Sequence, residues 1–197
     1  AYTSVSMTGN CWFGLLTAVI STVLFILVFA YTTITCRASQ TIVGVACNLF
    51  ASGITSVLHK FFSELSGTAG VGGSIVNSFP TIEIPILHNI PIIGVALFEH
   101  NIITYFALIM VPVLWVFKQK TAIGMNVIAV GEHPRAADSL GLNVIRIRYL
   151  AVIFSGVMMG IAGAYLSIAQ SGAFGEDMSS GRGYIALAIV ILGKWNS

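Results

Sequence analysis

The sequence has little charge. Only 8% of its 197 residues are charged, whereas 56% are hydrophobic, and the mean hydropathy is +0.93. Soluble domains carry about 25% charged residues, so this chain has too few polar groups to cover a water-facing surface. Its net charge of +2 comes without any basic run, which gives no indication of a nucleic-acid partner.

The chain also lacks the motifs of common enzymes and metal sites. Its four histidines are scattered, and neither His-Glu-x-x-His nor Gly-x-Ser-x-Gly occurs. The three cysteines have no metal-ligand spacing. The glycine-rich run at 66–74 lacks the Gly-Lys-Ser/Thr ending of a phosphate loop, so we expect a flexible loop there. We therefore expect no metal and no cofactor in this chain, and an intramembrane enzyme is disfavoured.

Long apolar runs are what the sequence does contain. One of them is 25 residues without a charge, and a membrane span needs about 20 apolar residues. The pattern predicts an all-α, polytopic helical membrane protein. The apolar segments are 11–35, 41–58, 91–117, 147–170 and 183–193. The last is too short to cross alone, and there is no initiator Met, so we expect a fragment truncated at both ends.

The segment 91–117 is longer than one span requires and allows two interpretations. In one, the span is 101–117, and Glu99, His100 and Asn101 lie at the membrane interface. In the other, the helix is broken and its polar turn lines a pathway.

Basic residues are concentrated in alternate connections between the segments. The connections at 36–40 and 118–146, with Arg148 just beyond, hold six Lys and Arg, whereas those at 59–90 and 171–182 hold two. Because Lys and Arg favour the cytoplasmic side, the first pair is predicted to be cytoplasmic. Residues 1–10 and the second pair are then external.

The stretch GEHPRAADSLGLN at 131–143 gathers charge in this apolar chain. Pro134 suits the first turn of a helix, and Gly141 suits the position just past its end. The two residues predict a capped helix of about two turns, with Glu132 at its positive end. A helix this short is unstable alone in water. It therefore either packs on its own protein or presents a rigid knob to a cytoplasmic partner.

The run GMNVIAVGEHPRAADSLGLNVIRIRYLAVIFSGVMMGIAGAYLSIAQSG, followed by GRGYIALAIVILGKW, resembles a family of ABC importer subunits. The family is the branched-chain amino acid/simple-sugar/nucleoside permease superfamily. Arg135-Ala136-Ala137-x-x-x-Gly141 resembles its "EAA" loop, with Arg in place of the Glu of the older pattern. SQTIVGVACNLFASGIT at 39–55 resembles the nucleoside-type branch, and within it the chain is most similar to the second, shorter permease of nucleoside importers.

The resemblance implies a type II-like ABC importer permease fold and a single transmembrane permease domain over 1–197, with a cytoplasmic coupling loop at 118–146. It implies a multi-pass subunit of a bacterial inner (plasma) membrane importer of nucleosides or simple sugars. The implied partners are ATP-binding subunits, a second permease of a different sequence, an extracytoplasmic substrate-binding lipoprotein and membrane lipid. ATP hydrolysis then takes place in a partner, so this chain is a transporter subunit and not an enzyme. The residues implied in coupling are Glu132, Pro134, Arg135, Ala136, Ala137, Asp138 and Gly141.

The 41–58 segment holds the candidates for the substrate path: Gln40, Asn48, Ser52 and Thr55. Asn48, Ser52 and Thr55 are spaced four and three residues apart and share one helix face. Such groups are costly in a membrane unless they are paired or wetted. They either pack between helices or line the path.

An ion-coupled secondary transporter of small polar solutes is the alternative function. Proton coupling uses an ionisable group in mid-membrane, and the segments 11–35, 41–58 and 147–170 contain no acid. Sodium coupling through backbone carbonyls stays open.

Overall fold

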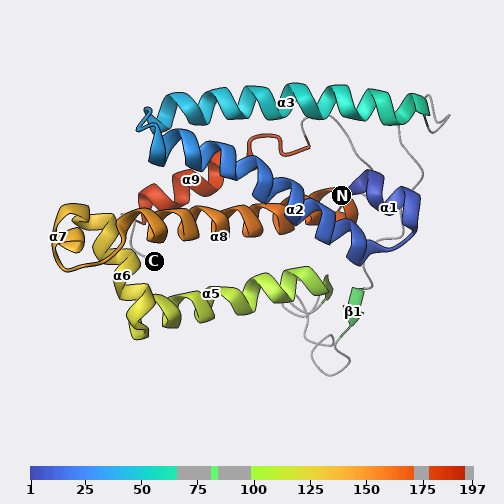
Figure 1. Ribbon diagram of the computed structural model, residues 1–197. Helices are drawn as coiled ribbons and strands as arrows, with labels where there is room; N and C mark the ends of the chain where they lie inside the picture. Colours follow the sequence, from blue (N-terminus) through green and yellow to red (C-terminus); the bar gives the residue numbers. More distant parts are fainter. Residues whose placement is uncertain (66–80, 84–98, 171–177, 194–197) are drawn as a thin grey trace.

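The computed structural model describes residues 1–65, 81–83, 99–170 and 178–193 (Figure 1). Within these ranges the protein is helical apart from two three-residue strands, which pair antiparallel. The all-α class is thereby confirmed. In chain order the elements are α1 (Tyr2–Thr8), α2 (Cys11–Ala30), η1 (Tyr31–Thr35), α3 (Gln40–Leu65), β1 (Thr81–Glu83), β2 (Glu99–Asn101), α5 (Ile102–Lys120), α6 (Ala122–Glu132), α7 (Pro134–Ser139), α8 (Val144–Ala164), η2 (Tyr165–Gln170) and α9 (Arg182–Leu192).

Four helices of the described chain are long and apolar enough to cross a membrane. They cover Cys11–Thr35, Gln40–Phe61, Ile102–Lys120 and Val144–Gln170. Three of the predicted segments thus agree with the structure to within a few residues. The helix Arg182–Leu192 is apolar but shorter. The glycine-rich run at 66–74 lies outside the described residues.

The third predicted segment, 91–117, differs from the structure at its start. Helix α5 begins at Ile102 with Asn101 as its N-cap, and Glu99–Asn101 form β2 before it. The side-chain amide of Asn101 donates to the carbonyl of Ala169, at 3.4 Å. This arrangement favours the interpretation in which the polar residues lie at the end of the span. Residues 91–98 lie outside the described residues.

The long helices lie side by side and alternate in direction (Figure 1). The turn between η1 and α3 lies at the same end as α6 and α7, and we call this the α7 end. Helix α1 and strand β1 lie at the opposite end, the α1 end. The predicted alternation of the connections is therefore confirmed for the two basic connections, which share one end.

The tightest helix pair is α2 with α8, and small residues make it possible. Gly156, Gly160 and Ala164 follow one another at intervals of four along α8 and all three are buried. A Cβ on Gly160 would lie 2.7 Å from the Cα of Val19, and one on Gly156 would lie 2.5 Å from the Cγ2 of Ile26. A side chain at Gly160 would separate the two backbones, and one at Gly156 would displace the side chain of Ile26, as expected for small-residue packing in membranes.

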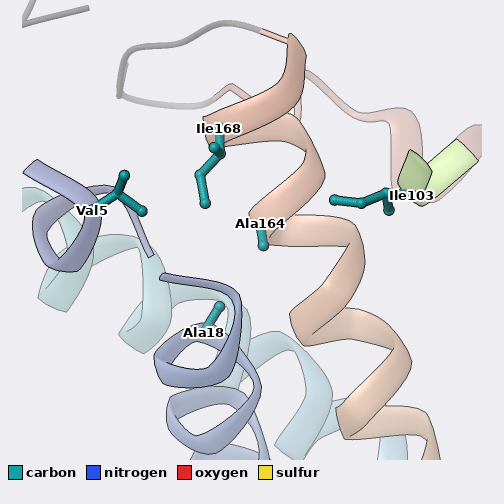
Figure 2. Close-up of a cluster of buried hydrophobic side chains, with 5 residues drawn as sticks. All are labelled: Val5, Ala18, Ile103, Ala164 and Ile168. Carbon is teal, nitrogen blue, oxygen red and sulfur yellow. The ribbon is translucent and has the colours of Figure 1, made fainter. Parts of the chain in front are cut away.

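A cluster of buried side chains joins five elements at the α1 end (Figure 2). Val5 comes from α1, Ala18 from α2, Ile103 from the first turn of α5, and Ala164 and Ile168 from the end of α8 and η2. Val5 and Ile168 are the largest fully buried side chains. Through Ile103, this cluster fixes the start of α5 against the α2–α8 pair.

Helix α2 widens at its C-terminal end into the π-helical turn η1. The N–H of Cys36 donates to the carbonyl of Tyr31, five residues back, at 3.1 Å. The hydroxyls of Thr32 and Thr33 donate to the carbonyl of Phe29 at 2.9 and 2.8 Å. Threonine hydroxyls that bond back to the helix in this way compete with the regular ladder. Thr32 and Thr33 thus weaken the regular ladder where the turn changes.

Candidate functional site

The loop predicted to couple the protein to a partner begins where the chain reverses direction at Thr121, between α5 and α6. Thr121 is the N-cap of α6, and its hydroxyl accepts from the N–H of Gly124 at 3.1 Å. Gly124 is buried against the end of α5, where a Cβ would lie 2.6 Å from the carbonyl oxygen of Lys118. Helix α6 can therefore fold back closely on α5 because residue 124 has no side chain.

The short helix that the sequence predicts between Pro134 and Gly141 is present as α7. Pro134 is its first residue, and the carbonyl of His133 accepts from the N–H of Ala137 at 3.0 Å. Gly141 has φ 83°, the left-handed region that favours glycine. The N–H of Leu142 then returns to the carbonyl of Ala137 at 3.1 Å. Because these hydrogen bonds extend to Leu142, only one residue, Asn143, lies between them and the start of α8 at Val144.

Glu132 lies beside the positive end of α7, and it also ends the preceding helix. It is the last residue of α6, and His133 separates it from the start of α7. A charge at this position meets the negative end of one helix and the positive end of the next. The two effects oppose each other, so Glu132 is not a simple stabiliser of α7. The sequence did not show that Glu132 also ends a helix, because it gives no signal for the end of α6 before His133, the N-cap of α7.

Helix α7 has an inner and an outer face. Ala137 is 2% exposed and is packed against its own protein. Arg135, Ala136 and Asp138 are exposed, and Leu140, which follows the helix, is 81% exposed. The predicted pair of docking alanines is therefore divided: Ala137 anchors α7 on the membrane domain, and Ala136 belongs to the surface. We call Arg135, Ala136, Asp138 and Leu140 the outer face of α7.

The charge of the described chain supports one orientation of this end. The α7 end carries the basic residues Arg37, Lys118, Lys120, Arg135, Arg146 and Arg148. In the described residues away from it, the Lys and Arg are Lys60 and Arg182. The excess of positive charge favours the cytoplasm for the α7 end.

We predict that a cysteine at Ser139 reacts with a membrane-impermeant maleimide only after the cells are permeabilised. A cysteine at Lys60, near the end of α3, should react in intact cells. Both positions are exposed, and the background would lack Cys11, Cys36 and Cys47. The reverse pattern of labelling would contradict the proposed orientation.

The candidate path residues lie on α3 and are exposed. At 3.6 residues per turn, Asn48, Ser52 and Thr55 share a face, which Thr41 extends by about two turns in one direction and His59 by about one turn in the other. Gln40, the first residue of α3, lies to the side of this face. We call the residues 41, 48, 52, 55 and 59 the polar stripe of α3.

The polar stripe points away from the other described helices. Helix α3 packs mainly on α2 and η1, and the rings of Phe50 and Phe25 stack with their centroids 6.3 Å apart. At 3.6 residues per turn, Phe50 lies roughly opposite the polar stripe. The Phe50 side of α3 also lines an open apolar hollow of about 750 Å³, formed by Leu49, Phe50, Gly53, Ile54, Val57 and Leu58. Two faces of different chemistry therefore run along α3.

Sequence reasoning missed other polar and apolar groups. The hydroxyls of Thr104 and Tyr105, in the first turns of α5, are buried without a hydrogen-bond partner in the described structure. Sequence reasoning also did not single out Leu140, although an apolar residue in this polar loop indicates a contact with a partner. Within the described residues, no group of three His, Cys, Asp or Glu is placed to hold a metal ion.

The sequence pattern of one protein family matches the chain over residues 1–197. It is described as the branched-chain amino acid transport system / permease component family. The chain belongs to this family. The family resemblance stated from the sequence is thereby confirmed, and a polytopic helical membrane protein is consistent with it.

Members with curated names are similar over most of this chain. The ABC transporter permease TsgC13 of Haloferax volcanii, named for glucose, is 38% identical over 96% of this chain and 56% of its own length. The guanosine ABC transporter permease NupQ of Bacillus subtilis is 36% identical over 94% and 57%. The nucleoside ABC transporter permease NupC of Lactococcus lactis is 34% identical over 98% and 61%. The chain thus spans about three fifths of the length of these relatives. No solved structure matches it.

Proposed function

We propose that the chain is a transmembrane permease subunit of an ATP-driven importer of nucleosides, with simple sugars as the second substrate class. The observation that carries the proposal is the outer face of α7, a short rigid helix at the basic end of four apolar helices. Membership of a permease family and relatives named for guanosine, nucleosides and glucose support it. An ion-coupled secondary transporter has no comparable support.

In this proposal, ATP hydrolysis takes place in separate ATP-binding subunits that dock on the outer face of α7. Arg135 and Asp138 offer charge to the partner, and Leu140 offers an apolar contact. Pro134 and Gly141 preserve the shape of the helix rather than touch the partner. Ala137 passes force inward, because it is the side chain of α7 that is buried against the membrane domain.

The polar stripe of α3 then lines the substrate path. The Thr55 hydroxyl donates to the carbonyl of Ala51 within α3 at 2.6 Å, but the polar groups of Asn48 and Ser52 would lack hydrogen-bond partners if they faced lipid, which is costly in the membrane. A path wetted by water and by a hydroxyl-rich solute satisfies them. The second permease, of a different sequence, stands opposite this face, and an extracytoplasmic binding lipoprotein delivers the solute at the α1 end. The importer lies in the bacterial inner (plasma) membrane.

The full-length importer, reconstituted with its ATP-binding subunits and binding protein, tests the function. We predict ATP-dependent uptake of labelled guanosine or uridine in excess of ribose, and no uptake of leucine. Omission of ATP, and an ATP-binding subunit that cannot hydrolyse it, are the controls. Uptake of leucine without nucleoside would contradict the substrate class, and uptake that follows a sodium gradient without ATP would contradict the importer.

A further inference from the structure

One side-chain hydrogen bond joins η1 to α8. The hydroxyls of Thr35 and Tyr149 lie 2.6 Å apart, although the residues are 114 positions apart in the sequence. Thr35 is the last residue of η1, and Tyr149 is the sixth residue of α8. The distance is that of a well-formed O–H···O bond.

Tyr149 is connected to α7 by short and closed pieces of chain. Beyond α7, Gly141 donates to the carbonyl of Asp138 at 2.9 Å. Asn143 then caps α8 by accepting from the N–H of Arg146 at 3.0 Å. Tyr149 follows within about two turns of the start of α8. A displacement of α7 is therefore passed to the first turns of α8, where Tyr149 lies.

Thr35 is connected to α3 by a short turn that is already unusual. It ends the π-helical turn η1, and π-turns are rare and occur frequently at functional sites. Arg37 follows with φ 53°, in the left-handed region, and α3 begins at Gln40. A movement of Thr35 therefore shifts the N-terminal end of α3.

Helix α3 is the long helix that the described chain holds least. In the most apolar part of its span no residue is buried, whereas 28% of the residues are buried in the corresponding part of the α8 span. Further along the α2–α8 pair, Gly160 lies against the backbone of α2 and Gly156 lies against the side chain of Ile26, which keeps that part of the pair rigid. A displacement of α7 should therefore move α3 more easily than it moves the closely packed part of α8.

We propose that the Thr35–Tyr149 hydrogen bond links α7 to η1 and α3, and so makes the position of the polar stripe depend on the position of α7. Both are positioning residues that contact neither the ATP-binding subunit nor the solute. This inference rests on the proposed function for its role in transport. The mechanical link itself concerns this chain alone.

Tyr149→Phe and Thr35→Val each remove one hydroxyl and keep the size of the side chain nearly unchanged. In the reconstituted importer, we expect either change to lower the amount of nucleoside imported per ATP hydrolysed about three- to ten-fold, the range set by one net hydrogen bond. The ATPase rate and co-purification of the ATP-binding subunit should be unchanged. The double variant should be no worse than either single variant, because the two groups act as one pair.

Thr35→Ser keeps the hydroxyl, so the amount of nucleoside imported per ATP hydrolysed should stay at the wild-type value. Thr22→Val is the matched control, since the hydroxyl of Thr22 bonds to the carbonyl of Ala18 within its own helix. Equal loss in Thr22→Val, or additive losses in the double variant, would overturn the link.

A second measurement needs no transport. Ala137→Val in the permease should displace α7 by crowding its buried contact, and hydrogen exchange of residues 31–39 should then change. The same substitution in a Tyr149→Phe background should leave that exchange unaltered. If Ala137→Val does not fold, Ala137→Ser serves as the milder variant. If Ala137→Val changes the exchange of residues 31–39 equally with and without the tyrosine hydroxyl, the link is refuted. If the wild-type importer shows no ATP-dependent uptake, only the proposed function is refuted.

Discussion

Gly160→Ala should lower the free energy of unfolding by about 1–3 kcal/mol, the usual cost of overpacking. Its new Cβ would stand 2.7 Å from the Cα of Val19 and 3.3 Å from the carbonyl oxygen of Ala18. Both atoms belong to the backbone of α2, so no side chain can turn away to make room. The two helices must move apart, and the close contacts of the α2–α8 pair are lost along with them. Gly160→Leu should prevent the pair from forming.

Gly163 provides the matched control on the same helix. A Cβ on Gly163 would meet nothing within 4 Å. Gly163→Ala should therefore be neutral or should stabilise α8 by up to about 1 kcal/mol, since alanine is the better helix former. Thermal unfolding of the two purified variants in the same detergent gives the comparison. Equal midpoints for Gly160→Ala and Gly163→Ala would show that α2 and α8 do not pack through residue 160.

Changes on the two sides of α7 should have different consequences. Leu140→Asp replaces a side chain that is 81% exposed, so the permease should fold with unchanged stability. If that side chain is buried against the ATP-binding subunit, its loss removes about 1.5–3 kcal/mol of contact, a ten- to hundred-fold loss of affinity at about 1.4 kcal/mol per factor of ten. ATP-dependent uptake should fall with it. Ala136→Leu, also on the outer face, should act in the same direction.

Ala137→Leu should instead act on the permease itself. Ala137 is 2% exposed, and three added carbons have no space there. The expected cost is about 1–3 kcal/mol of the permease's own stability, measurable before any partner is added. Co-purification of the ATP-binding subunit and thermal unfolding of the permease, recorded for each variant, separate the two effects. Leu140→Met, which keeps the apolar volume, is the control.

These two experiments also decide between the interpretations that the sequence left open for α7. If Leu140→Asp and Ala136→Leu bind the ATP-binding subunit as the wild type does and transport normally, α7 serves only to pack on its own protein. If they fail while the permease stays stable, α7 presents a docking surface.

Much of the architecture could be read from residue types and spacing. A charge-free run of the length of 11–35 predicts a helix that crosses a membrane, because a helix satisfies its backbone groups within one segment. Pro134 fixes its own φ, and Gly141 readily adopts the left-handed conformation that ends a helix, so the limits of α7 followed from local chemistry. The spacing of Gly156, Gly160 and Ala164 indicated a close helix contact, which the structure contains. These features depend on properties that each residue carries wherever the chain folds.

Other features depend on which elements meet, and the sequence alone could not decide them. Ala136 and Ala137 are identical residues in adjacent positions, and only the packing of α7 on the membrane domain makes one buried and the other exposed. Glu132 is part of α6 because that helix continues up to His133, the N-cap of α7. Thr35 and Tyr149 are 114 residues apart, and their contact exists only because small residues bring α2 and α8 together. Local preference determined the helices of this protein, whereas side-chain contacts between distant segments determined which of their faces are exposed.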